Sequence, residues 1–98
     1  MYEVQQTGVF RRWLSRVKDH QGRTAILRRI KRAKKGNVGD VKAVGKGVFE
    51  MRIPTGPGYR VYYMQTGKRV YLLLSGGDKS SQQADIDAAC EMATDIKR

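Results

Sequence analysis

Residues 49–82 read FEMRIPTGPGYRVYYMQTGKRVYLLLSGGDKSSQ, and turn residues divide this stretch into three runs typical of β-strands. In the first run, apolar side chains alternate with Glu50 and Arg52, which is the two-residue period of a strand with one buried face. The PTGPG cluster at 54–58 predicts a hairpin loop, and TGK at 66–68 predicts a second turn. Three strands are therefore predicted, at Val48–Ile53, Tyr59–Gln65 and Val70–Ser75.

One more strand and three helices are predicted from the rest of the chain. Thr7 is suited to cap the first helix, and apolar residues recur along one side of each helix at the helical period. The further elements are a strand at Tyr2–Gln6, a first helix ending near Asp19, a second over about Arg23–Lys35, a glycine-rich loop at Asn37–Gly47, a strand break at Gly76–Gly77, and a last helix capped by Ser80 or Ser81.

The length and order of these elements predict the fold class. With 98 residues the chain has room for one core, so we expect a single domain over residues 1–98. The class is α+β in the order β-α-α-β-β-β-α, with an antiparallel-rich sheet and the helices packed on one of its faces.

The charge of the chain is strongly positive and unevenly distributed. Twenty lysines and arginines against nine acids give a formal net charge of +11. Residues 11–35 hold eleven basic residues and one acid, a net +10, whereas residues 80–98 hold four acids and two basic residues, a net −2. This imbalance predicts a polyanionic partner, either nucleic acid or the ribosome, and the plainer alternative is a solvated basic surface.

Three cations stand on or just after the predicted strands. Arg52 and Arg60 alternate with the core residues of their strands, and Lys79 follows the third strand. Side chains two residues apart point the same way, so the two arginines are expected on the face opposite the core. Cations on rigid strands predict a site that handles phosphate. Two other interpretations stay open: Arg60 pairs with Glu50 across the hairpin, and Lys79 only serves a turn.

The residue inventory restricts the chemistry of such a site. One histidine, one cysteine and no clustered carboxylates predict neither a zinc site nor a two-metal site, and we expect no cofactor. RNA supplies its own nucleophile in the 2′-hydroxyl group. A nuclease that uses lysine, arginine, tyrosine or a carboxylate therefore remains open.

The N-terminal stretch MYEVQQTGVFRRW has no apolar core of the kind a signal peptide needs. The longest apolar run, Val70–Leu74, is too short to span a bilayer. Cys90 is the one cysteine, so no intramolecular disulfide can form. We expect a cytoplasmic protein without membrane contact.

Four pieces of the chain form a set: GDVK at 39–42, FEMRI at 49–53, GYRVYY at 58–63 and LLLSGGDKSSQ at 72–82. Together they resemble the RelE/ParE superfamily of bacterial toxins, and most closely its phage-type addiction module killer proteins, which are HigB-like. The resemblance covers nearly the whole chain. It implies a small fold of helices and strands, endoribonuclease activity on mRNA, and neutralisation by a cognate antitoxin, expected to be of the helix-turn-helix type.

The resemblance also implies roles for individual residues. Arg60 matches a phosphate-contacting arginine of RelE-like toxins, and Lys79 matches the position of a second arginine. Arg52 matches a lysine implicated in proton transfer, although arginine is a poorer base. RelE uses a tyrosine in its C-terminal segment, whereas this chain has none after Tyr71. The predicted catalytic residues are Arg52, Arg60 and Lys79.

A second set of residues is predicted to bind RNA. Arg28, Arg32 and Lys35 stand at i, i+4 and i+7 on one side of the second helix, where they contact an RNA backbone or form a solvated face. Lys46 and Tyr62 complete the set. Tyr62 shares the Arg60 face and is expected either to stack a base or donate a proton, or to belong to the core.

The sequence thus predicts the toxin of a type II toxin–antitoxin module that cleaves mRNA in ribosome context. Two alternatives stay open. One is a ParE-like toxin that binds DNA gyrase without nuclease activity, and the other is a basic RNA-binding module without activity.

Overall fold

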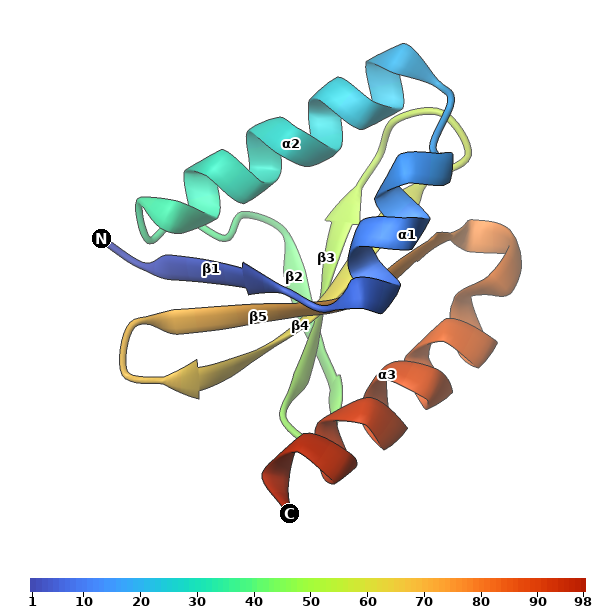
Figure 1. The fold of residues 1–98 in the computed structure, drawn as a ribbon. Coiled ribbons are helices and arrows are strands. Elements are labelled where there is room, and N and C mark those ends of the chain that lie inside the picture. The colour runs from blue at the N-terminus through green and yellow to red at the C-terminus, as the bar shows by residue number, and fades with distance from the viewer.

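Five strands form one mixed sheet in the computed structural model, which describes residues 1–98 (Figure 1). In spatial order they are β1 (Glu3–Gln6), β5 (Val70–Asp78), β4 (Tyr59–Gly67), β3 (Val48–Ile53) and β2 (Val41–Gly45). β1 runs parallel to β5, and every other neighbouring pair is antiparallel. The three helices are α1 (Gly8–Arg16), α2 (His20–Lys34) and α3 (Gln82–Lys97), and the short 3₁₀ helix η1 (Lys79–Ser81) precedes α3. The predicted α+β class is confirmed.

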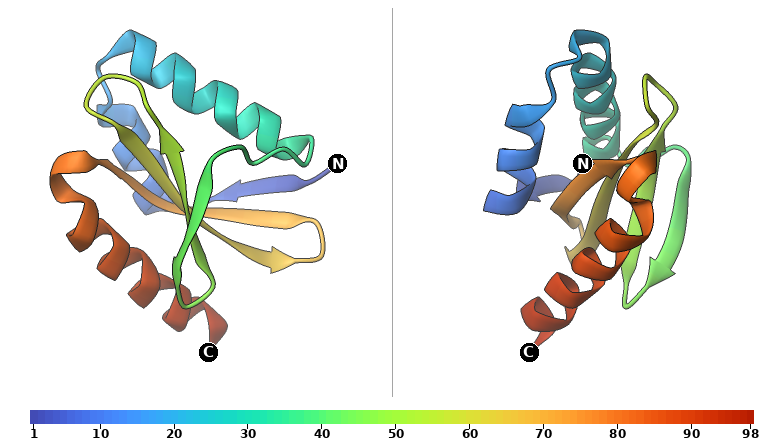
Figure 2. Two further views of the ribbon diagram at one scale, coloured as in Figure 1. Left: turned by 180° about the vertical axis from the view of Figure 1, so that it is seen from behind. Right: turned by 90° about the vertical axis from the view of Figure 1, so that its right-hand side faces the viewer.

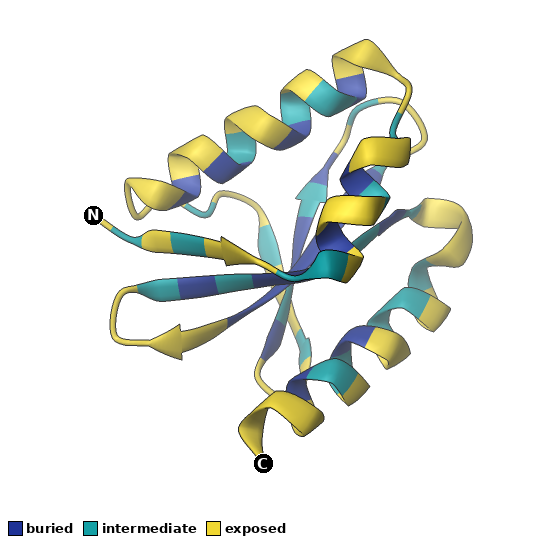
Figure 3. Ribbon diagram, viewed as in Figure 1, coloured by how far each residue is buried: buried dark blue, intermediate teal, exposed yellow.

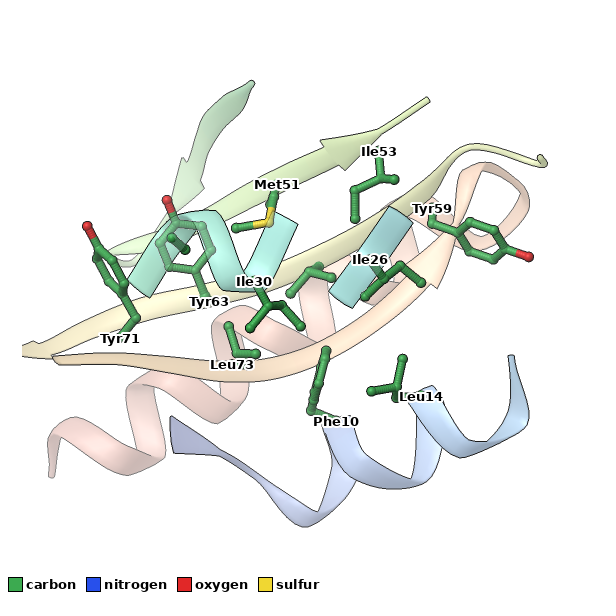
Figure 4. Packing of buried hydrophobic residues seen from close by; sticks show 12 residues of the cluster. Phe10, Leu14, Ile26, Ile30, Met51, Ile53, Tyr59, Tyr63, Tyr71 and Leu73 are labelled. Carbon is green, nitrogen blue, oxygen red and sulfur yellow. The ribbon is translucent and has the colours of Figure 1, made fainter. Parts of the chain in front are cut away.

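The helices cover both faces of the sheet. Phe10 and Leu14 of α1 and Ile26 and Ile30 of α2 pack on one face, where they meet strand residues such as Met51 (Figure 4). On the other face a smaller cluster joins Val48, Tyr62, Met64 and Leu74 to Ala89 and Ala93 of α3. In Figure 1, α2 lies above the crossing strands and α3 lies below them. The prediction that the helices pack on one face is wrong, because α3 buries the face that was expected to be exposed.

The first helix begins where its cap residue predicts. The Thr7 hydroxyl accepts a hydrogen bond from the Phe10 amide (3.0 Å) and donates one to the Leu74 carbonyl (2.7 Å). The cap therefore also fixes the start of α1 to β5. The helix ends at Arg16, three residues before the predicted end, because Val17 adopts an extended conformation.

Residues 37–47, predicted as a loop, contain strand β2. Val41 pairs with Met51 and Ala43 with Phe49 on β3. Lys42 and Ala43 are exposed at this edge of the sheet, so the strand has no strong apolar alternation to reveal it.

The predicted strand break at Gly76 and Gly77 is wrong, because β5 continues through both residues to Asp78. A side chain at Gly76 would collide with Trp13 of α1, and one at Gly77 would collide with Asp85 of α3. The two glycines face opposite sides of the strand, and each lets a helix approach the backbone closely.

None of the three helices combines the length and the apolar character needed to cross a membrane.

Candidate functional site: a basic pocket at the ends of β3, β4 and β5

The three predicted catalytic cations line one open pocket of about 590 Å³. Arg52 comes from β3, Arg60 from β4 and Lys79 from η1. The other lining residues are Asp40, Ile53, Pro54, Gly56, Pro57 and Gly58. The structure therefore brings together three cations that stand up to 27 positions apart in the sequence, and it places the β3–β4 loop around them.

Strand register explains why the cations meet. Arg52 and Arg60 are direct cross-strand partners, so their Cβ atoms are about 5 Å apart on the same sheet face. Gly77 is the partner of Arg60 on the next strand, and Lys79 follows two residues later. Like charges directly opposite each other repel, which makes an anion between them favourable.

The turn that carries Lys79 is held by Asp78. The Asp78 carboxylate accepts hydrogen bonds from the Ser80 amide (2.8 Å) and the Ser80 hydroxyl (2.5 Å). These bonds lower the pKa of Asp78 below its ordinary value, with the hydroxyl contributing most. Lys79 itself is exposed and lies against Gly58, so its ammonium group can reach the pocket.

Asp40 adds a carboxylate to the pocket, although it was not among the predicted site residues. Its Oδ1 lies 3.0 Å from Nη2 of Arg52, which is the one ion pair in the structure. Arg29 of α2 holds the two segments together, because it donates to the carbonyls of Arg52 (2.5 Å), Val38 (2.9 Å) and Asp40 (3.2 Å). Burial, with a smaller contribution from Arg32, lowers the pKa of Arg29 from its ordinary value.

Arg60 is 9% exposed, the most buried of the three cations. It makes no ion pair with Glu50. The alternative in which Arg60 pairs with Glu50 across the hairpin is therefore wrong. Its Nε atom is buried and has no hydrogen-bond partner. The expectation that Arg60 lies on a face away from the core is also wrong, since α3 covers that face.

The polar residues behind the pocket form a buried network. Glu50 is 1% exposed, and its Oε2 accepts hydrogen bonds from the Tyr62 hydroxyl (3.1 Å) and from Nε2 of Gln82 (3.0 Å). Burial, and next the nearby Glu50 carboxylate, raise the pKa of Tyr62 well above its ordinary value. A fully buried tyrosine cannot stack on a base. The prediction that Tyr62 contacts RNA is therefore wrong for this structure.

The other four predicted RNA-binding residues lie outside the pocket. Arg28 and Arg32 of α2 and Lys35, which directly follows the helix, are exposed. Figure 3 shows that much of α2 is exposed. Lys46 is exposed in the β2–β3 turn, and its carbonyl accepts a hydrogen bond from Lys97 of α3. That turn and the β3–β4 loop, which lines the pocket, lie at opposite ends of β3, as the view from behind shows (Figure 2).

No group of three or more histidine, cysteine, aspartate or glutamate side chains is placed to share a metal ion. The chemistry available at the pocket is therefore that of two guanidiniums, an ammonium and one carboxylate around a space without an aromatic side chain. Guanidinium and ammonium groups favour phosphate oxygens, and the carboxylate and the ammonium group are the proton acceptor and donor of this set.

The model of the family described as "Phage derived protein Gp49-like (DUF891)" matches residues 12–96. The chain belongs to this Gp49-like family. A Gp49-like protein is a member of a toxin-like addiction module family, so the predicted addiction-module class is confirmed at that level.

One similar relative spans nearly the same length. It is a protein of Haemophilus influenzae named "Uncharacterized protein", which is 43% identical over 94 residues, or 96% of this chain and 95% of the relative. The similarity therefore extends over nearly the full length of both sequences.

Proposed function

We propose that this Gp49-like protein is the toxin of a type II toxin–antitoxin module, and that it cleaves mRNA as a metal-independent endoribonuclease of the RelE type, in ribosome context. One observation carries the proposal: Arg52, Arg60 and Lys79 meet in a single pocket, together with the carboxylate of Asp40. The substrate of the toxin is mRNA on the ribosome. The protein partner expected for a toxin of this class is an antitoxin.

The pocket supplies each step that cleavage of RNA requires. Asp40 accepts the proton of the 2′-hydroxyl, whose oxygen then forms a bond to phosphorus. Arg52 and Arg60 bind the non-bridging oxygens and stabilise the charge that grows on them in the transition state. Lys79 donates a proton to the 5′ oxygen as the P–O5′ bond breaks. The products are a 2′,3′-cyclic phosphate and a free 5′-hydroxyl group.

The pairing of Asp40 with Arg52 suits this assignment of roles. The ion pair orients the carboxylate oxygen at 3.0 Å from a group that itself binds phosphate. Proton transfer by positioned side chains contributes about 10²- to 10⁴-fold to a rate. Arg52, which the resemblance matched to a proton-transfer position, then serves as a phosphate ligand, in agreement with its poor basicity.

The absence of an aromatic side chain from the pocket also fits a ribosome-dependent enzyme. The lining residues offer charge and loop backbone but no ring on which a base could stack. Such a pocket binds the RNA backbone rather than a base. Base preference and correct presentation of the codon would then come from the ribosome.

Induced expression without antitoxin tests this function. Primer extension on a translated reporter transcript should show new 5′ ends inside the reading frame. Intact transcripts together with defective DNA supercoiling would favour the ParE-like alternative, which needs no phosphate pocket. Intact transcripts with normal supercoiling would favour the inactive RNA-binding module.

A pair of lysine variants distinguishes a role of the pocket in cleavage from a general effect of positive charge on RNA binding. Lys79→Ala changes an exposed residue of the pocket, and Lys68→Ala changes an exposed residue of the β4–β5 turn. Both remove one positive charge and no core contact. We expect Lys79→Ala to reduce cleavage at least about 100-fold, the lower bound for losing a general acid, while Lys68→Ala cleaves like the wild type. Equal cleavage by the two variants would remove Lys79 from the mechanism.

A further inference from the structure

A second concave surface lies at the other end of α2, where the helix approaches β1. It has a volume of about 420 Å³ and is lined by Met1, Gln6, Leu27, Ile30, Lys31, Lys34 and Lys35; we name it the α2–β1 groove. Its floor is apolar, and three lysines surround that floor. None of its residues belongs to the basic pocket that holds Arg52, Arg60 and Lys79.

Two of the three apolar residues of the floor, Met1 and Leu27, are open to solvent. Leu27 is 45% exposed, which is unusual on a helix whose other large aliphatic residues, Ile26 and Ile30, are buried. Met1, beside it in the groove, is also exposed. Exposed aliphatic side chains that gather in a concave site mark a surface that binds another molecule.

The three lysines have no acidic partner in the chain. The one ion pair of the structure joins Arg52 and Asp40, far from this groove. Lysines at a helix C-terminus are stabilised by the helix dipole, which explains why they are tolerated there. The dipole does not explain why they surround exposed leucine and methionine side chains, whereas a partner that carries both carboxylates and apolar groups does.

We propose that the α2–β1 groove binds an acidic amphipathic segment of the antitoxin, with an apolar side chain on Leu27 and carboxylates on Lys31, Lys34 and Lys35. This inference rests on the proposed function, because it names the docking surface for the partner of that toxin. A volume of 420 Å³ lies within the range of about 300–1,000 Å³ seen for binding pockets. An RNA backbone would satisfy the lysines but offers no apolar group for Leu27.

The position of the groove has a consequence for the complex. The β3–β4 loop of the basic pocket lies near the start of α2, because Gly56 of the loop is close to the Asp19 carboxylate, to which the Tyr59 hydroxyl at the start of β4 donates (3.3 Å). The groove lies along the second half of this helix, where Leu27 is about 10 Å from His20 along the helix axis. A segment confined to the groove therefore contacts no residue of the basic pocket.

Paired substitutions test the docking surface with the intact toxin. The probe is the protein encoded next to this toxin, which the proposed function takes as its antitoxin, purified and titrated calorimetrically against wild type and variants. Leu27→Asp places a charge on the groove floor, and Val9→Asp is its matched control, because Val9 of α1 is 42% exposed and lies outside the groove. We expect Leu27→Asp to weaken binding at least about tenfold and Val9→Asp to leave it unchanged. Leu27→Ala should weaken binding in the same direction without adding a charge.

A second pair tests the lysines. Lys34→Glu should slow association and reduce its dependence on salt, whereas Lys68→Glu, in the β4–β5 turn, should not. Equal melting temperatures of all variants would show that folding is unaffected. If Leu27→Asp or Val9→Asp is destabilised, the antitoxin affinities of Leu27→Ala and Lys34→Glu test the docking surface without them.

The outcomes separate this inference from the proposed function. Wild-type affinity in both Leu27→Asp and Lys34→Glu overturns the inference, while antitoxin still neutralises the toxin. Weaker RNA cleavage by Lys34→Glu with unchanged antitoxin binding also overturns it, and assigns the lysines to RNA. A toxin that fails to cleave RNA at all overturns the proposed function, whatever the variants show.

Discussion

Replacing Asp40 by asparagine removes the proposed proton acceptor and changes little else. Asparagine keeps the shape of the side chain and an oxygen that can still accept a hydrogen bond from Arg52. It cannot take the proton of the 2′-hydroxyl. Loss of a general base lowers a rate by about 10²- to 10⁴-fold, which corresponds to about 2.7–5.4 kcal/mol of transition-state stabilisation.

The expected effect of Asp40→Asn on folding is much smaller. The side chains of Arg52 and Asp40 are 42% and 59% exposed, so their ion pair is screened by solvent. Exposed pairs contribute about 0.2–1 kcal/mol. In a domain of this size that amounts to a shift of at most about 8 °C in melting temperature. The loss of rate must therefore greatly exceed any loss of folded protein.

Single-turnover cleavage of mRNA on programmed ribosomes measures this rate directly. Asp87→Asn is the matched control, because Asp87 is an exposed aspartate of α3 that accepts one hydrogen bond, from Gln83 (3.0 Å). The control should cleave at the wild-type rate. The reasoning fails if Asp40→Asn cleaves within about tenfold of the wild type, or if its loss of activity only matches its unfolded fraction.

Three further predictions concern stability. Tyr62→Phe removes one of the two hydrogen-bond donors to the buried Glu50 carboxylate. Urea denaturation should therefore show a free energy of unfolding that is lower by about 1–3 kcal/mol. The variant should remain toxic, because the buried Tyr62 side chain does not reach RNA. Gly77→Ala places a methyl group against Asp85. It should lower the free energy of unfolding by about 1–3 kcal/mol and thereby the melting temperature. An unchanged melting temperature would contradict the close packing of α3. Burial raises the pKa of Tyr63 from 10.0 to about 12, so the contribution of its neutral form to stability is complete below pH 10 and is lost as the pH rises towards 12. Urea titrations between these pH values should show a slope of up to about 1.4 kcal/mol per pH unit from this residue, and Tyr63→Phe should remove it.

Local patterns in the sequence predict most of the elements. The strands at Val48, Tyr59 and Val70 begin where predicted, since breaker residues bound each of them. The Thr7 cap predicts the start of α1, because a hydroxyl in that position satisfies an amide of the first turn. β2 was missed because an exposed edge strand buries few apolar side chains, which leaves little periodicity to detect.

The covering of the second sheet face could not be predicted from periodicity. An alternating pattern shows which residues share a face, but it does not show what packs against that face. Glu50 and Tyr62 are polar or amphipathic, so their face resembled a solvent-exposed surface. The small residues Ala89 and Ala93 of α3 bring that helix close enough to bury it.

The candidate site, like the fold, could be predicted only in part from the sequence. Arg52 and Arg60 could be predicted to meet, because both the hairpin and the alternation are local features. Asp40 could not, since it reaches Arg52 only through the pairing of β2 with β3 and the hydrogen bonds of Arg29. A carboxylate twelve positions from its partner gives no signal in sequence spacing.

The two glycines of β5 also affect how a genetic selection against the toxin should be interpreted. Selections that collect survivors of toxin expression recover any substitution that abolishes activity, whether it removes chemistry or prevents folding. A side chain at Gly76 would collide with the ring of Trp13, and one at Gly77 would displace the Asp85 carboxylate; the two glycines stand three and two positions before Lys79. Survivors should therefore accumulate at both glycines and suggest an extended catalytic motif. Soluble protein levels would distinguish them, because a glycine variant should be degraded or insoluble, whereas an inactive Lys79 variant should accumulate at normal abundance.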